Sequence, residues 1–201
     1  ILLDVTDPVQ IVAAQALVAS SMGEQGLVGL VNNAGVAVGG PLEFLPLAEL
    51  LYQMDVNVYG VLAVTQAFLP LLRRATGRII NISSISGLAS SPFIGPYAAS
   101  KYALEALSDA LRLELRPWGI PVVLIEPGTI ATPIWQKGLA MADRLLAQLP
   151  PAAYTLYGPV FPFMRARLAN PKGIPADMVA QVVAQALAAK QPKARYLVGN
   201  D

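Results

Sequence analysis

The sequence contains neither cysteine nor histidine in its 201 residues. These absences exclude disulfides, thiolate or imidazole zinc sites, catalytic cysteines and every histidine-based triad, so a general base has to be a tyrosine, a lysine or a carboxylate. Charged residues are also scarce, at 13%, and the net charge is only +1. No strong electrostatic field is therefore available to recruit nucleic acid or an anionic membrane surface. We predict a cytoplasmic protein with no metal site and no nucleic-acid partner.

The chain also lacks an uninterrupted apolar run of membrane-spanning length, although 55% of its residues are hydrophobic. Its most apolar long stretch, residues 54–72, is broken by Asp55, Asn57 and Gln66. We therefore predict no transmembrane segment. The apolar excess is better explained by a sheet that is covered on both faces and by helices that pack against a partner subunit.

Short apolar strands alternate with longer helical segments along the chain. We expect strands at 27–31, 78–84, 122–126 and 195–198, with the opening Ile-Leu-Leu as the end of an earlier strand. We expect helices that start at Pro8 and near Leu47, and others at 54–74, 96–116 and 175–190. This alternation with short connections predicts one α/β domain over residues 1–201, a Rossmann-like doubly wound parallel sheet with helices on both faces. The functional site of such a fold lies at the carboxyl ends of the strands.

The first expected helix has clear start signals. Asp7 is placed to be its N-cap, and Pro8 follows at the first helical position. We expect the buried face of this helix to comprise Val9, Val12, Ala13, Ala16 and Leu17.

Tyr97 and Lys101 are four residues apart in the segment PYAASKY, and Ser84 ends the segment GRIINISS. Positions i and i+4 lie on one face of a helix, so an ammonium group beside a phenol can favour the ionised phenol and make it a proton-transfer group. This combination indicates the chemistry of an alcohol dehydrogenase that works without a metal.

Five separate pieces of the sequence carry a family resemblance. They are Asp4-Val5, Asn32-Asn33-Ala34-Gly35, Asn57 in VNVYG, the set Ser84, Tyr97 and Lys101, and Pro127-Gly128 with Thr132. In this order and spacing they resemble the classical short-chain dehydrogenase/reductase family. The glycine-rich phosphate loop of that family is not in these residues, so we expect the chain to lack the first βαβ part of the fold and to be truncated at its N-terminus.

The resemblance implies roles for four residues in catalysis. Tyr97 would be the general acid/base, with Lys101 and the oxidised nicotinamide lowering its pKa. Ser84 would hold and polarise the substrate oxygen. Asn57 would bend its helix and hold a water that connects Lys101 to solvent.

The resemblance also implies a nicotinamide cofactor, NAD or NADP, and the residues that bind it. The residues expected to contact this cofactor are Asp4, Val5, Asn32, Ala34, Gly35, Tyr97, Lys101, Pro127, Gly128, Ile130 and Thr132. The residue that separates NAD from NADP in the family is not in this sequence.

Residues 134–170 are unusually apolar for a segment next to the site, and we interpret them as a substrate lid. Such a lid suits an apolar alcohol or ketone, for example a steroid, a retinoid or a fatty compound. The alternative is that this segment packs against a partner subunit or a missing strand. We expect a homodimer or homotetramer through helices 54–74 and 96–116. An NAD(P)-dependent oxidoreductase leads the function hypotheses, ahead of an epimerase or dehydratase with the same residues and of a non-catalytic binding or scaffold domain.

Overall fold

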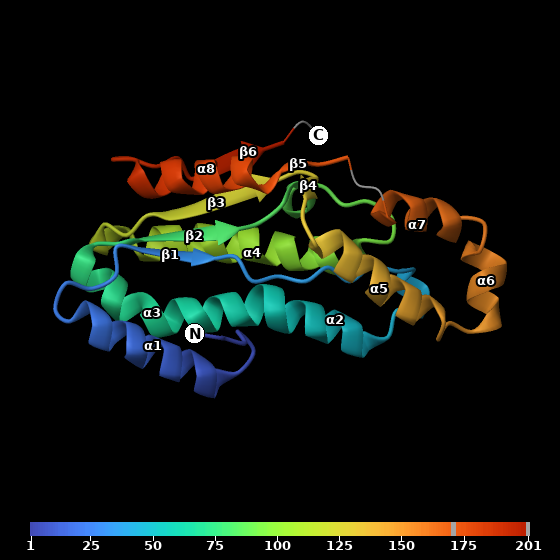
Figure 1. Cartoon of the computed structure of the whole chain (residues 1–201), viewed down its shortest axis with the longest axis horizontal. Helices are drawn as coiled ribbons and strands as arrows, with labels where there is room; N and C mark the ends of the chain where they lie inside the picture. Colours follow the sequence, from blue (N-terminus) through green and yellow to red (C-terminus); the bar gives the residue numbers. More distant parts are fainter. Residues whose placement is uncertain (170–171, 200–201) are drawn as a thin grey trace.

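The computed structural model describes residues 1–169 and 172–199, in which a parallel sheet lies between layers of helices (Figure 1). The sheet has four strands in the order β1-β2-β3-β6, and each neighbouring pair is parallel. Its strands are β1 (Gly29–Asn32), β2 (Arg78–Ile82), β3 (Val122–Pro127) and β6 (Arg195–Val198). The predicted parallel α/β fold is confirmed, and these four strands begin and end within two residues of their predicted positions.

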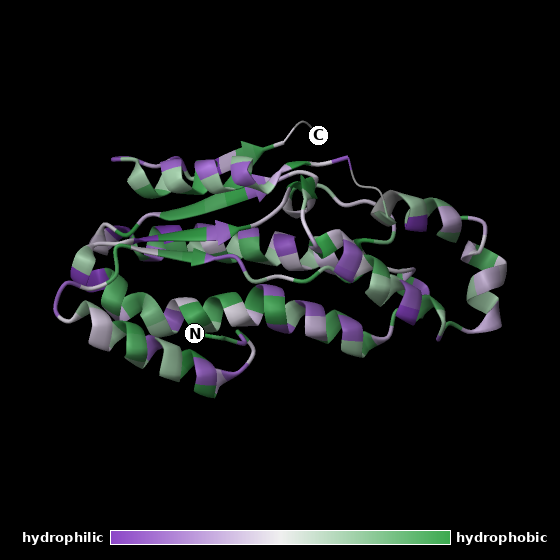
Figure 2. Ribbon diagram, viewed as in Figure 1, coloured by the Kyte–Doolittle hydropathy of each residue, from purple (hydrophilic) through white to green (hydrophobic). Residues whose placement is uncertain are grey.

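Helices cover both faces of the central strands. Successive strand residues point to opposite faces, so Ile79 packs with Leu72 and Leu115 on one side, whereas Ile80 packs with Ala186 on the other. The helices involved are α3 (Val61–Ala75), α4 (Gly95–Glu114) and α8 (Ala176–Ala188). Figure 2 shows the strands as an apolar layer between these helices, as expected for a parallel sheet that is buried on both faces.

The first three residues do not form the expected strand end. Ile1 and Leu2 are exposed, at 80% and 98%, and this segment pairs with no strand in the part of the chain that the structure describes. A turn follows at once, in which Asp7 N donates to Asp4 O at 3.1 Å. An apolar tripeptide has no secondary-structure period of its own, so only a neighbouring strand could have made it part of a sheet.

Helix α1 (Pro8–Met22) begins as predicted but buries a different face. Asp7 is the N-cap and accepts from Val9 N at 2.8 Å and from Gln10 N at 3.2 Å. The face that packs against α3 contains Ile11 and Ala14, while the face predicted to be buried is mostly exposed. The prediction of that face was wrong because both sides of this helix are apolar, so that periodicity cannot choose between them.

One long helical rod runs from Leu47 to Ala75. It consists of α2 (Leu47–Met54), a π-helical turn η2 (Asp55–Gly60) and α3. Among the described residues, this rod is the one helix that is long and apolar enough to cross a membrane, judged by length and composition alone. However, 56% of its most apolar 18-residue window is buried inside the protein. Burial of this kind is typical of a core helix.

Three helices gather beyond the carboxyl ends of the strands (Figure 1). They are α5 (Ile134–Leu146), α6 (Pro151–Tyr157) and α7 (Phe161–Ala169), and they make up most of the segment predicted as a lid. A second, two-stranded parallel sheet of β4 (Ile130–Ala131) and β5 (Ile174–Pro175) joins the two ends of this segment. The last residue of the predicted lid, Asn170, lies outside the described residues. The remaining helical turns are η1 (Leu42–Phe44), η3 (Ile85–Gly87) and η4 (Arg116–Trp118).

Candidate active site

Ser84 and Tyr97 meet where β2 ends and α4 begins. Ser84 is the N-cap of η3, and its Oγ accepts from Ser86 N at 3.1 Å and donates to Pro127 O at 3.4 Å. Tyr97 lies in the first turn of α4, half-buried, with its hydroxyl close enough to the Ser84 side chain for that side chain to lower the pKa of the phenol. The structure therefore brings together the two hydroxyl groups that the sequence singled out.

Lys101 lies one turn along α4 from Tyr97 and is buried, with 5% of its surface exposed. Its Nζ donates to Ile82 O at 2.8 Å and lies 5.7 Å from the centroid of the Tyr97 ring. Burial lowers the pKa of Lys101 to about 8, partly opposed by the negative charge of Glu105. No carboxylate in the described part of the chain forms an ion pair with this ammonium.

The expected acidification of Tyr97 by its lysine neighbour is not what the structure shows. Burial raises the pKa of the Tyr97 phenol, and the hydrogen bond with Ser84 opposes this only in part. Lys101 donates to the Ile82 carbonyl, and its charge is not among the causes that act on the pKa of Tyr97. In the chain by itself, Tyr97 is therefore held as a neutral proton donor.

Asn57 lies in the π-helical turn η2 and is buried. Its Oδ1 accepts from Val36 N at 2.9 Å, and its Nδ2 donates to Val36 O at 3.0 Å and to Ser100 Oγ at 3.1 Å. Single π-turns inside helices occur frequently at functional sites. The expected distortion of the helix at Asn57 is present, and the amide of this residue ties the loop after β1 to the helix of Tyr97.

Gln53 belongs to the same arrangement, although sequence reasoning did not select it. This side chain is fully buried, accepts from Val38 N at 2.7 Å and donates to Val36 O at 2.8 Å. Gln53 and Asn57 are one turn apart, and together they bond the backbone of the loop as a neighbouring strand would. A glutamine between apolar residues was the available signal, but only the fold shows what it bonds.

Asn32 lies at the end of β1, and its side chain is turned into the protein. Its Nδ2 donates to Thr65 Oγ1 at 3.0 Å and to Asn81 Oδ1 at 2.8 Å, and Asn81 in turn donates to Ser108 Oγ at 2.8 Å. This buried chain of hydrogen bonds links β1 and β2 to α3 and α4. The side chain of Asn32 therefore stabilises the sheet that carries the site.

Asp4 and Val5 lie on the other side of the loop that follows β1. Asp4 is exposed and accepts from Thr6 N at 2.9 Å and Thr6 Oγ1 at 2.7 Å, and these bonds lower the pKa of its carboxyl group. Val5 packs against Gly60, where an added Cβ would lie 2.8 Å from Val5 Cγ2. The absence of a side chain at Gly60 is therefore what allows this segment to approach η2.

An open cavity of about 460 Å³ lies between the Asp4–Val5 segment and the loop that follows β1. Its lining includes Asp4 and Val5 from one side and Ala34 and Gly35 from the other. A Cβ added at Gly35 would meet its nearest protein atom, Asn57 Oδ1, at an ordinary 3.5 Å. Packing within the chain does not require glycine at this position, so the open backbone is free to serve a ligand.

The segment after β3 forms the next wall of the site. Pro127 ends β3, Gly128 N donates to Val198 O at 2.9 Å, and Ile130 belongs to β4. The indole Nε1 of Trp135 donates to Ile130 O at 2.6 Å, which fastens the start of α5 to this segment. Thr132 is half-buried between β4 and α5.

The helices of the expected lid are fastened to the loop after β1 by an aromatic cluster. The ring of Tyr157 packs edge-on against Phe44 and Phe93, and its hydroxyl donates to Glu43 Oε2 at 2.9 Å. A small apolar cavity of about 30 Å³ remains between α5, α7 and residues 39–46. Within residues 1–169 and 172–199 no group of three or more acidic side chains is arranged to hold a metal ion.

Comparison with known proteins agrees with this geometry. Residues 1–143 match the family model described as short chain dehydrogenase. An NADPH-dependent 3-dehydrocapnine reductase from Ornithobacterium rhinotracheale is 40% identical over 97% of this chain and 69% of its own length. Human retinol dehydrogenase 5 is 40% identical over 100% of this chain and 65% of its own length.

A solved short-chain dehydrogenase from Streptomyces avermitilis has the same fold, with a TM-score of 0.78 and 31% identity over 100% of this chain and 70% of that one. The chain thus spans about two thirds of the length of these curated relatives. The match of the family model to most of the chain, together with these relatives, shows that the chain belongs to the short-chain dehydrogenase family.

Proposed function

We propose that this protein is an NAD(P)-dependent oxidoreductase that interconverts an apolar secondary alcohol and its ketone. The observation that carries the proposal is the proximity of the Ser84 and Tyr97 hydroxyls, with the buried Lys101 one helical turn away. A proton donor and a second hydroxyl that lie side by side can hold and protonate the same substrate oxygen.

The cavity beside Gly35 supports a cofactor site. Small residues at the end of β1 leave backbone free, the cavity is open to solvent, and it lies at the carboxyl ends of the strands, where ligands of doubly wound folds bind. We propose that Asp4, Val5, Ala34 and Gly35 hold the adenosine side of the cofactor. The side chain of Asn32 stabilises the end of β1 next to this region through its hydrogen bonds with Thr65 and Asn81.

The nicotinamide end would lie between the segment 127–132 and the residues Tyr97 and Lys101. When bound, the nicotinamide accepts or supplies the hydride. We propose that the backbone of Pro127, Gly128 and Ile130, together with the hydroxyl of Thr132, orients it. The NADPH-dependent relative supports a cofactor of this kind.

In ketone reduction the chain's own residues move the proton. Ser84 donates a hydrogen bond to the carbonyl oxygen and positions it, and Tyr97 donates the proton from its phenol. A raised pKa favours this direction at neutral pH, because the phenol keeps its proton until it is needed. Alcohol oxidation uses the same residues in reverse, with Tyr97 as the base, and is therefore favoured by higher pH. Asn57 keeps the loop after β1 and the helix of Tyr97 in register during both.

The apolar helices α5, α6 and α7 support an apolar substrate. They lie beyond the carboxyl ends of the strands and are fastened to residues 39–46, where they can exclude water from hydride transfer. The human relative is named as a retinol dehydrogenase, which is consistent with this class.

The test is an absorbance assay for nicotinamide reduction by full-length protein with NAD and NADP. The substrates are retinol, a steroid alcohol and a long-chain secondary alcohol, set against a short polyol. We expect kcat/KM to be higher by roughly tenfold or more for the apolar alcohols, because several buried methylene groups each contribute about 0.8 kcal/mol. Equal kcat/KM for polyol and apolar alcohols would overturn the substrate class. Absence of nicotinamide-dependent turnover with every alcohol and with the matching ketones would overturn the proposed function.

A further inference from the structure

Lys101 and Glu105 occupy successive turns of one face of α4, so the face that carries Tyr97 continues into a group of acids. Glu105 is 6% exposed, and its Oε2 accepts from Arg195 Nε at 3.1 Å. Its other carboxylate oxygen, Oε1, is buried and has no hydrogen-bond partner in the part of the chain that the structure describes.

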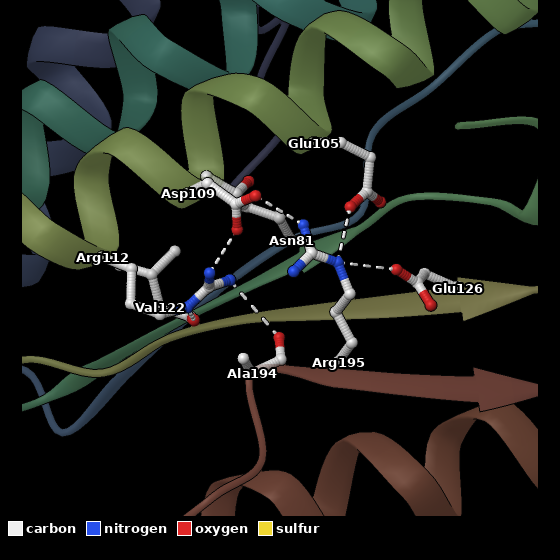
Figure 3. A network of polar contacts seen from close by, with 9 residues as sticks. Asn81, Glu105, Asp109, Arg112, Val122, Glu126, Ala194 and Arg195 are labelled. Carbon is white, nitrogen blue, oxygen red and sulfur yellow. Dashed lines mark hydrogen bonds and ion pairs between the residues drawn. The ribbon is translucent and has the colours of Figure 1, made fainter. Parts of the chain in front are cut away.

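Arg195, on strand β6, orients the Glu105 carboxylate through its hydrogen bond. It reaches from β6 between Glu105 and Asp109 of α4 and Glu126 of β3 (Figure 3). Its second contact with α4 is a 2.7 Å bond to Asp109 Oδ2. Asp109 also pairs with Arg112, which itself donates to Val122 O at 2.7 Å.

Glu126 is the third carboxylate that contacts Arg195, at 3.1 Å from its Nε. It is fully buried, and burial together with the nearby charge of Glu105 raises the pKa of its carboxyl group, against the influence of Arg195.

Close packing holds the stem of Glu105 against η3, one helical turn from Lys101. A Cβ added at Gly87 would lie 3.0 Å from Glu105 Cγ, 3.1 Å from Ser83 Oγ and 3.2 Å from the carbonyl carbon of Lys101. The bare backbone of η3 at Gly87 therefore lets α4 pack closely against it, at the turn that carries Lys101 and Glu105. The titratable groups near the lysine on its own helix are Tyr97 and Glu105. Arg195 on β6 forms an ion pair with Glu105 and another with Glu126 on β3.

We propose that Glu105 is a positioning residue for the active site, whose carboxylate is oriented by Arg195 and balances the buried charge of Lys101. The hydrogen bond to Ile82 O satisfies one ammonium proton but supplies no charge. The consequence for catalysis rests on the proposed function, in which Lys101 works beside Tyr97. The charge balance itself can be measured without any turnover.

The experiment is an NMR titration of the lysine side-chain ε-carbons in full-length protein. The 201 residues include five lysines, Lys101, Lys137, Lys172, Lys190 and Lys193, and Lys101→Met identifies the resonance of interest. We expect a midpoint of about 8 for Lys101. Glu105→Gln should lower this midpoint by roughly one pH unit, the lower end of the shift that a nearby opposite charge produces.

Asp109→Asn is the matched control, because it removes a carboxylate bonded to the same arginine one turn further along. This control should leave the Lys101 midpoint within about 0.3 units, well below the effect of an adjacent charge. Glu105→Asp keeps the charge but moves it further from the ammonium, and should lower the midpoint by less than Glu105→Gln does. If Glu105→Gln does not fold, as judged by circular dichroism, Glu105→Asp is compared with Asp109→Glu, and only the former should move the midpoint downward.

Equal shifts for the Glu105 and Asp109 variants, or no shift in Glu105→Gln, would overturn the proposal. A shifted midpoint in a protein that oxidises no alcohol would support the role of Glu105 and overturn only the proposed function.

Discussion

Replacing Gln53 by methionine should destabilise the protein far more than the same change at an exposed glutamine. Methionine has nearly the same shape, so little packing is lost, but Val38 N loses its acceptor and Val36 O loses one of its two donors. An orphaned buried N–H group costs about 1–3 kcal/mol, and the lost bond to Val36 O adds about 1 kcal/mol. We expect the free energy of unfolding to fall by roughly 2–4 kcal/mol.

Gln10 provides a matched control for this experiment. It also makes two hydrogen bonds, with Asp4 N and with the Asp7 carboxylate, both at 2.9 Å, but it is exposed, so that water can replace them. Gln10→Met should change stability by less than about 0.5 kcal/mol. Urea unfolding followed by circular dichroism measures both variants. Similar losses for the two substitutions would refute the reasoning that burial makes the bonds of Gln53 matter.

Three further predictions follow from the packing and charge of the site. Gly60→Ala should lower the free energy of unfolding by about 1–3 kcal/mol, because the added Cβ would lie 2.8 Å from Val5 Cγ2. Gly35→Ala should leave the free energy of unfolding nearly unchanged but weaken cofactor binding in a fluorescence titration. Lys101→Met should raise stability at pH 7 by roughly 1–3 kcal/mol. A lysine whose pKa is lowered to about 8 on folding destabilises the folded state below that pH. The stability gained by Lys101→Met should therefore shrink as the pH rises towards 10.5, where the lysine is neutral in both states. A gain that does not depend on pH in urea unfolding would contradict this. Sedimentation at micromolar concentration should show a dimer or tetramer formed through α3 and α4, and a monomer would refute that interface.

The sequence was sufficient to predict the parallel sheet and the closeness of three polar side chains at the carboxyl ends of its strands. Arg195–Val198 forms a strand at the predicted residues, and Ser84, Tyr97 and Lys101 converge as expected. Strands of a parallel sheet and the spacing of residues on one helix are local features, so a single sequence carries them.

What the sequence could not predict depends on contacts between distant segments. The partners of Gln53 are backbone groups on a loop 15 and 17 residues earlier, and Arg195 reaches Glu105 across 90 residues. Lys101 likewise donates to a carbonyl on β2, and burial raises the pKa of Tyr97, opposite to the expected direction. None of these partners has a sequence spacing that a helix or strand period would reveal.

The most direct test of the central claim compares two tyrosines on α4. Tyr97→Phe removes the hydroxyl beside Ser84. Tyr102→Phe removes the hydroxyl of an exposed tyrosine, which donates to Leu88 O at 2.5 Å. Both variants should fold and bind the nicotinamide cofactor, as measured by fluorescence. Loss of general acid/base catalysis should reduce kcat by about 10²–10⁴-fold in Tyr97→Phe, with little change in Tyr102→Phe. Wild-type kcat in Tyr97→Phe would contradict the assignment of the proton-transfer group.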